Sequence, residues 1–200
     1  MILAALAACS RYDEVKNLAS SGQTIVAFGD SLTSGYGARD GQDYPSVLSA
    51  RIGTTIINAG VNGDTTESAL QRVESDVLPE EPRIVIVGLG GNDALRGVPI
   101  AETEANLRSI ISTIQDAGAM VILLGYRFPT MRGDYEGMYE RVAEETGSLL
   151  IDDLLDGILS DPKLKSDAIH PNAAGYELIA GRVEEPLREL ITAAEKATRP

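Results

Sequence analysis

The chain has 200 residues, the size of one ordinary domain, and 44% of them are hydrophobic while 24% are charged, a balance that excludes a disordered chain. The formal net charge of −13 makes nucleic acid a poor partner and disfavours adsorption to anionic lipid, because an acidic surface repels phosphate groups. The single cysteine, Cys9, excludes an intrachain disulfide.

The first residues are apolar and end in Leu6-Ala7-Ala8-Cys9. This run is too short to span a bilayer. Its last four residues resemble a bacterial lipobox, in which the cysteine is lipidated, so we expect a lipid anchor at Cys9 and a place in the cell envelope, in the periplasm. The alternative is a short apolar helix with an incidental cysteine. We expect residues 1–20 to be this segment and a linker, and residues 21–200 to form a single domain.

From residue 24 onward, apolar strand-like runs alternate with stretches of helical spacing. The run at residues 84–89 is continuously apolar, which is typical of a strand covered on both faces. Residues 100–117 instead place their apolar side chains on one helical stripe. Five strands separated by helices predict a parallel sheet between two helical layers, an α/β/α sandwich. The predicted strands are residues 25–28, 54–59, 84–89, 120–124 and 149–151. The predicted helices are residues 44–52, 66–78, 100–117, 135–146 and 172–194.

Ser31 follows the first predicted strand, at the end where parallel sheets place their active groups. Gly29, Gly35 and Gly37 ease a tight strand-to-helix turn around it. A serine at the start of a helix gains from the positive end of the helix dipole and from free N–H groups. On this segment alone, Asp30-Ser31 is more typical of a helix N-cap.

Two further glycine-bearing loops follow the second and third predicted strands. Residues 58–66 contain the turn dipeptide Asn62-Gly63, and a glycine there lets a backbone N–H approach a ligand. Residues 90–93, Gly-Gly-Asn-Asp, would project the Asn92 amide, which stabilises a developing oxyanion without competing for a proton. Each loop by itself is also typical of an ordinary turn whose polar side chains bond the backbone.

His170 is the only histidine, and Asp167 lies three residues before it. This spacing lets the carboxylate meet the imidazole Nδ1–H while Nε2 faces Ser31. Pro171 pre-orders the loop, because it disfavours the helical region for His170. Nucleophile, base and orienting acid are the parts of a catalytic triad. One histidine and one cysteine are too few for a common zinc site, so we expect no metal.

Together these segments resemble the SGNH, or GDSL, hydrolase family in both residues and order. The family's four invariant residues are matched by Ser31, Gly63, Asn92 and His170. Gly63 is preferred to Gly60 because Asp64-Thr65 follows it, as in the family's Gly-Asp-Thr pattern. The resemblance covers residues 24–190, and residues 91–97 are similar to bacterial acyl-hydrolases of the thioesterase, arylesterase and lysophospholipase type.

The resemblance implies a flavodoxin-like fold with five parallel strands, and a serine esterase that acts on a small-molecule acyl ester through an acyl-enzyme, without a cofactor. Ser31 Oγ would attack the ester or thioester carbonyl, His170 would move the proton, and Asp167 would orient the imidazole. The Ser31 N–H, the Gly63 N–H and the Asn92 side chain would bind the oxyanion.

Residues 93–99 and 127–137 are expected to form loops beside this site and to line the acyl pocket. Neither loop is long enough for a large lid, so we expect short to medium acyl chains and no interfacial activation. The residues expected to contact substrate are Asp93, Leu95, Arg96, Phe128 and Ile169.

The sequence is also compatible with two other functions. The same triad serves carbohydrate acetyl-esterases. From another class, an envelope lipoprotein could bind acylated ligands without hydrolysing them, although the complete set of five catalytic groups argues against it.

Overall fold

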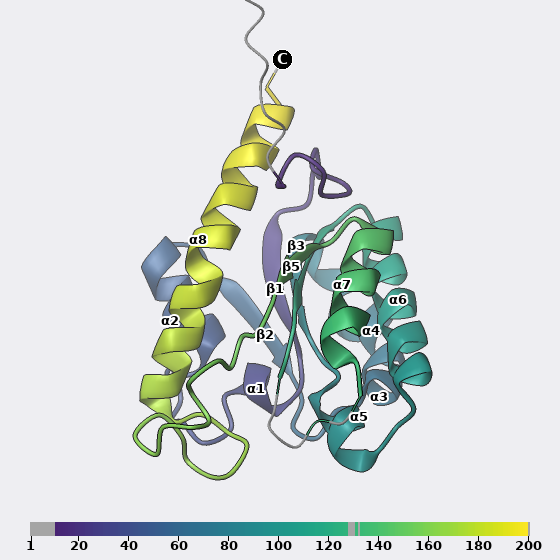
Figure 1. Cartoon of the computed structure of the whole chain (residues 1–200). Coiled ribbons are helices and arrows are strands. Elements are labelled where there is room, and N and C mark those ends of the chain that lie inside the picture. The colour runs from purple at the N-terminus through teal and green to yellow at the C-terminus, as the bar shows by residue number, and fades with distance from the viewer. Residues whose placement is uncertain (1–10, 128–130, 132, 200) are drawn as a thin grey trace, which may run out of the picture.

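The computed structural model describes residues 11–127, 131 and 133–199, so Cys9 and Phe128 lie outside the described residues. A five-stranded parallel sheet forms its centre and helices cover both faces (Figure 1), which confirms the predicted α/β/α sandwich. The strands are β1 (Thr24–Gly29), β2 (Ile56–Gly60), β3 (Pro82–Gly88), β4 (Met120–Leu124) and β5 (Leu149–Ile151). The longer helices are α2 (Tyr44–Ile52), α6 (Ile100–Asp116), α7 (Tyr135–Thr146) and α8 (Ala173–Ala197).

Short helical segments complete the fold, and these are where the structure departs most from the predicted elements. They are α1 (Ser31–Ser34), α3 (Thr66–Leu70), α4 (Val73–Asp76), the 3₁₀ helix η1 (Leu78–Glu80) and α5 (Gly91–Arg96). The single helix predicted over residues 66–78 is wrong, because it is broken between α3 and α4. The break falls at Arg72, whose φ of −118° and ψ of −2° depart from α-helical values.

The strand order is β2-β1-β3-β4-β5, so the chain moves outward from β1 to β2 and then returns to the other side of β1. Helices α2 and α8 pack together on one face, while α3, α4, α6 and α7 lie on the other (Figure 1). In open sheets of this order, successive connections diverge to opposite faces between β1 and β3, and a crevice opens outside their carboxyl ends. The fold therefore places a site after β1 and β3.

The three strands that border this crevice end level with one another, and each ends in glycine. Gly29 of β1 lies opposite both Gly60 of β2 and Gly88 of β3. A Cβ atom on Gly29 or Gly60 would collide with α1, at Thr33 and Ser34 respectively. The glycines thus let α1 lie directly against the ends of the strands.

The sheet interior explains why the fold is stable enough to hold such a site. Residues 84–87 of β3 and 121–124 of β4 are fully buried between the two helical layers. Burial of each such aliphatic side chain contributes about 1.5–3 kcal/mol. The strand that leads to Asn92, β3, is therefore among the most deeply packed parts of the molecule.

Residues 11–20, which we expected to lie outside the fold, pack against it. Val15 is buried in the main core, and the Lys16 N–H donates to the carbonyl of Gly147. The Asn17 side chain donates to the carbonyls of Gln115 and Ala119. The expected boundary at residue 20 therefore lies too far along the chain, because these contacts join residues 15–17 to the ends of α6 and α7.

Among the residues that the structure describes, no helix is both long enough and apolar enough to cross a bilayer.

Candidate active site

The side chains of Ser31, His170 and Asp167 form a continuous hydrogen-bonded chain. Ser31 opens α1 directly after β1, and its Oγ lies 3.0 Å from His170 Nε2. On the other side of the ring, His170 Nδ1 lies 2.8 Å from Asp167 Oδ2 and 3.0 Å from Oδ1. The structure therefore brings the three predicted residues together, in the order that a triad requires.

The loop that carries His170 is closed by its own hydrogen bonds. The N–H groups of Ile169 and His170 each donate to Asp167 Oδ1 over 2.9 Å. Ser166 N–H donates to the His170 carbonyl, and Lys165 pairs with Pro171. Partial burial works to raise the pKa of Asp167, but the Ile169 N–H and the bonds to His170 outweigh it and hold that pKa below its ordinary value. Asp167 therefore stays an acceptor.

Two tyrosines support this loop, and the sequence reasoning missed both. The ring of Tyr36 lies against the imidazole of His170, with a centroid separation of 4.5 Å. The buried Tyr176 hydroxyl donates to the Tyr36 carbonyl over 2.8 Å. Burial raises the pKa of Tyr176, so its hydroxyl remains a donor.

The three predicted oxyanion donors lie on the segments that follow β1, β2 and β3. Within the described part of the chain, the N–H groups of Ser31 and Gly63 donate to no protein acceptor. Gly63 has a φ of +82°, a conformation that side chains with a Cβ rarely adopt. The Asn92 amide comes from the first turn of α5 and donates to the Asp64 carbonyl over 2.8 Å. Unused N–H groups beside a nucleophile are suited to receive an oxyanion.

Asp30, immediately before Ser31, is a buried carboxyl with only 2% of its surface exposed. Its Oδ1 accepts the Leu32 N–H over 2.9 Å, and its Oδ2 faces the Asn92 amide at 3.4 Å. Burial, together with the nearby carboxylates of Asp64 and Asp93, raises the pKa of Asp30 to about 7. Three acidic side chains therefore lie close to a position where negative charge would develop.

The residues expected to contact substrate occupy different positions. Leu95 and Ile169 line a small cleft with Ser31 and His170. Arg96 lies at the exposed rim and donates to the Gly63 carbonyl over 2.7 Å. Asp93 does not line the cleft, because its buried carboxylate accepts the N–H and hydroxyl of Thr66. The geometry thus gives Asp93 a bracing role between α3 and α5.

The cleft itself has a volume of only about 10 Å³, but Leu95 also lines a neighbouring hollow of about 450 Å³. Apolar side chains in that hollow include Val98, Ile100 and Tyr135. Another hollow, of about 460 Å³, is lined by Arg39, Gln42 and Asn172 among others, next to the loop that carries His170. The cleft therefore has two recesses near it, and both mix polar and apolar groups in their lining.

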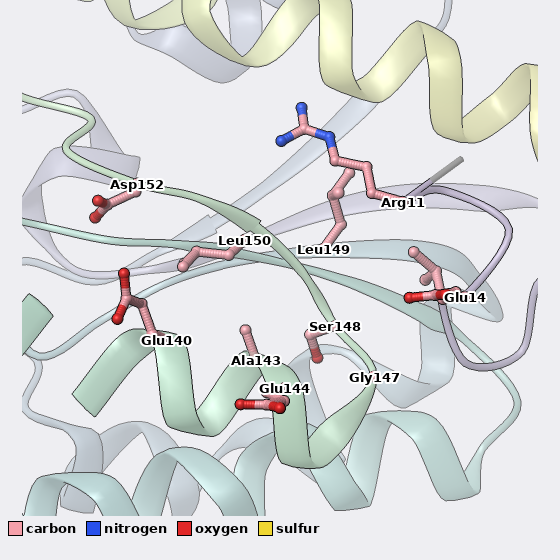
Figure 2. A pocket seen from close by; sticks show the side chains of 11 residues that line it. Arg11, Glu14, Glu140, Ala143, Glu144, Gly147, Ser148, Leu149, Leu150 and Asp152 are labelled. Atoms are coloured by element: carbon pink, nitrogen blue, oxygen red, sulfur yellow. The ribbon is translucent and has the colours of Figure 1, made fainter. Parts of the chain in front are cut away.

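A larger cavity, of about 600 Å³, lies away from the triad beside β5. Figure 2 shows carboxylates from three segments around it: Glu140 and Glu144 project from α7, Glu14 from the segment before β1, and Asp152 from the residue after β5. The only histidine of the chain is in the triad, so this cavity holds no comparable base. The described residues also contain no group of three histidine, cysteine, aspartate or glutamate side chains placed to hold a metal ion.

Comparisons with known proteins agree with this geometry. A model of the GDSL-like lipase/acylhydrolase family matches residues 27–178. The chain belongs to this family. It is an ester hydrolase of the SGNH type, with esterase or acylhydrolase activity on small-molecule acyl esters, which confirms the family expected from the sequence.

Individual relatives of this hydrolase differ in their named activities. Thioesterase 1/protease 1/lysophospholipase L1 of Escherichia coli strain K12 is 30% identical over 181 residues, covering 86% of this chain and 87% of that protein. The crystal structure of AlinE4, an SGNH-hydrolase family esterase, has 36% identity and a TM-score of 0.68, covering 90% of this chain and 98% of that one. An acetylxylan esterase of Geobacillus stearothermophilus is 28% identical over 201 residues, covering 80% and 91% respectively.

The raised pKa of Asp30 makes the stability of the hydrolase depend on pH. A buried carboxyl whose pKa rises from 3.8 to about 7 contributes stability that is fully present below about pH 4 and is lost as the pH rises through 7. Asp30→Asn keeps an oxygen for the Leu32 N–H but cannot ionise. Between pH 5 and pH 8, the free energy of unfolding of the wild type should fall by about 2–3 kcal/mol more than that of the variant. Urea unfolding at both pH values measures this, and parallel pH dependences would contradict it.

Proposed function

We propose that the protein hydrolyses short- to medium-chain acyl esters, and by the same chemistry thioesters or lysophospholipids, through a Ser31–His170–Asp167 triad and an acyl-enzyme. The observation that carries this proposal is the unbroken chain of hydrogen bonds from Ser31 Oγ to the Asp167 carboxylate. The N–H groups of Ser31 and Gly63, which donate to no acceptor in the described part of the chain, support it independently.

Acylation begins when Ser31 Oγ attacks the substrate carbonyl while His170 Nε2 takes the hydroxyl proton. Asp167 holds Nδ1–H and stabilises the imidazolium. The Ser31 and Gly63 N–H groups and the Asn92 amide bind the oxyanion of the tetrahedral intermediate. As the intermediate collapses, His170 returns the proton to the leaving alcohol or thiol. Water, activated by His170, then attacks the carbonyl of the acyl-enzyme. Collapse of the second tetrahedral intermediate releases the acid and returns the proton from His170 to Ser31 Oγ.

The two recesses beside the cleft suggest how a substrate lies. The acyl chain extends past Leu95 into the hollow that contains the apolar side chains of Val98 and Ile100. The leaving group extends past Tyr36 toward the recess that contains Arg39 and Gln42. Because Leu95 lines both the narrow cleft and the first hollow, it limits the length of the acyl chain.

A carbohydrate acetyl-esterase is the second candidate function. The acetylxylan esterase relative and the small volume directly over Ser31 favour it. An acetyl group needs no apolar recess. A preference for acetate over longer acyl esters would therefore favour the acetyl-esterase over the short- to medium-chain acyl esterase. Hydrolysis is preferred to mere binding of acylated ligands, because a binding protein has no use for an aligned triad.

The proposed roles of Ser31 and Asn92 are tested with p-nitrophenyl esters from acetate to palmitate and with palmitoyl-CoA. Ser31→Ala should lose measurable turnover. Asn92→Ala should fold normally and lose roughly 10²–10³-fold in kcat with little change in KM, because the oxyanion forms only after attack.

A fluorophosphonate probe that labels wild type but not Ser31→Ala provides an independent control for the nucleophile. Near-wild-type turnover by Asn92→Ala would remove Asn92 from the mechanism. A wild type that is inert toward every ester and toward the probe would leave only the binding function.

The acyl-length limit at Leu95 is tested by Leu95→Ala, with Leu178→Ala on α8 as a matched control. The two leucines are similarly exposed, at 44% and 45%. Shortening Leu95 should raise kcat/KM for the C8–C12 esters relative to the C4 ester by about 10-fold, since one apolar contact is worth about 1–3 kcal/mol. An unchanged chain-length profile in Leu95→Ala, or the same change in Leu178→Ala, would exclude this role.

We also propose that Cys9 anchors the protein in the cell envelope through a covalent lipid, as the Leu6-Ala7-Ala8-Cys9 sequence indicates. The full chain, expressed in bacteria with radiolabelled palmitate, should incorporate label and sediment with membranes, whereas Cys9→Ser should do neither. Equal distribution of the two proteins between membrane and soluble fractions would contradict the anchor.

A further inference from the structure

Arg72 is a nearly buried cation that the proposed chemistry does not use. Its side chain is 15% exposed and comes from the break between α3 and α4. The guanidinium bonds in three directions: Nε donates to Asp64 Oδ2 over 2.6 Å, Nη2 to the Gly29 carbonyl over 3.0 Å, and Nη1 to Asp76 Oδ2 over 3.1 Å. Its central carbon also lies 4.3 Å from the centre of the Phe28 ring.

Two of these partners belong to the segments that supply the oxyanion donors. Gly29 is the last residue of β1, two residues before Ser31. Asp64 directly follows Gly63, and its carbonyl accepts the Asn92 amide over 2.8 Å. One guanidinium therefore links the strand that precedes Ser31 to the loop that contains Gly63. Through Asp64, it is also connected to the Asn92 side chain.

The charge of Arg72 matters as much as its geometry. Asp30, Asp64 and Asp93 are all buried, and their carboxyls lie near one another beside the proposed oxyanion donors. Unpaired carboxylates would repel a developing oxyanion, and the repulsion is strong where water is excluded. By pairing with Asp64, Arg72 offsets one of these charges while it holds the loop.

We propose that Arg72 is a positioning residue for the hydrolytic reaction: it fixes the Gly63–Asp64 backbone relative to Ser31, so that the oxyanion donors converge before substrate binds. This inference rests on the proposed function. Lysine would not replace it, since an ammonium cannot match the planar fork that reaches Asp64 and Gly29 while lying on Phe28.

The test compares Arg72→Lys with Arg108→Lys, a matched change at an arginine that pairs with Glu104 within α6 and with Glu145 on α7. Circular dichroism and thermal melting establish folding. In Arg72→Lys, kcat for p-nitrophenyl butyrate should fall by roughly 10-fold or more while KM changes by less than about threefold, because the donors act in the transition state. Arg108→Lys should retain kcat within about twofold, as expected for an exposed pair.

A second readout separates positioning from a general loss of structure. An alkyl trifluoromethyl ketone forms a hemiketal oxyanion on the serine, so its inhibition constant should rise in Arg72→Lys by the same factor by which kcat/KM falls. Unchanged kcat and unchanged inhibition in folded Arg72→Lys would overturn the inference.

Asp64→Asn tests the same link from the other side if Arg72→Lys fails to fold. It removes the carboxylate partner of Arg72 but keeps the main-chain carbonyl that accepts the Asn92 amide. A comparable loss of kcat would support the inference, and wild-type kcat would overturn it. Failure of wild type to react with the fluorophosphonate probe would instead overturn the proposed function, and this inference with it.

Discussion

The structure depends on one constraint: three parallel strands end level, in glycine, at the point where the chain changes direction. Gly29, Gly60 and Gly88 lie side by side across β2, β1 and β3. Because these positions carry no Cβ, the turn of α1 rests directly on the sheet and Ser31 projects into the crevice. The loops after β2 and β3 begin at the same edge of the sheet, so short loops are enough to bring their polar groups near Ser31.

Charge balance around this edge is the second determinant. The carboxyls of Asp30, Asp64 and Asp93 are buried close to the site, although an ester hydrolase must stabilise negative charge there. Each is tied to a donor: Asp30 to the Leu32 N–H, Asp64 to Arg72, and Asp93 to Thr66. The hydrogen bonds that brace the loops thus also limit the repulsion that these carboxyls would exert.

Much of this arrangement could be predicted from the sequence, because it is encoded locally. Apolar runs and glycine-bearing strand ends identified the five strands and the segments that contain Ser31, Gly63 and Asn92. Strand order could not be read, because it depends on which long-range pairings form. The break at Arg72 was missed for the same reason: residues 66–78 have helical spacing, but the partners that draw Arg72 inward lie on other segments. Tyr36 was missed because the ring that it contacts, that of His170, is 134 residues away in the sequence.

The separation of Ser31 and His170 in the sequence determines when the site can form during synthesis of the chain. The two residues of this contact are 139 positions apart, with Ser31 directly after the first strand and His170 on the loop before the last helix. A growing chain therefore contains Ser31 long before it contains His170, since chains emerge from the ribosome N-terminus first. Under the proposed mechanism, nascent and C-terminally truncated chains would not hydrolyse esters, and hydrolysis would begin only when the final loop docks.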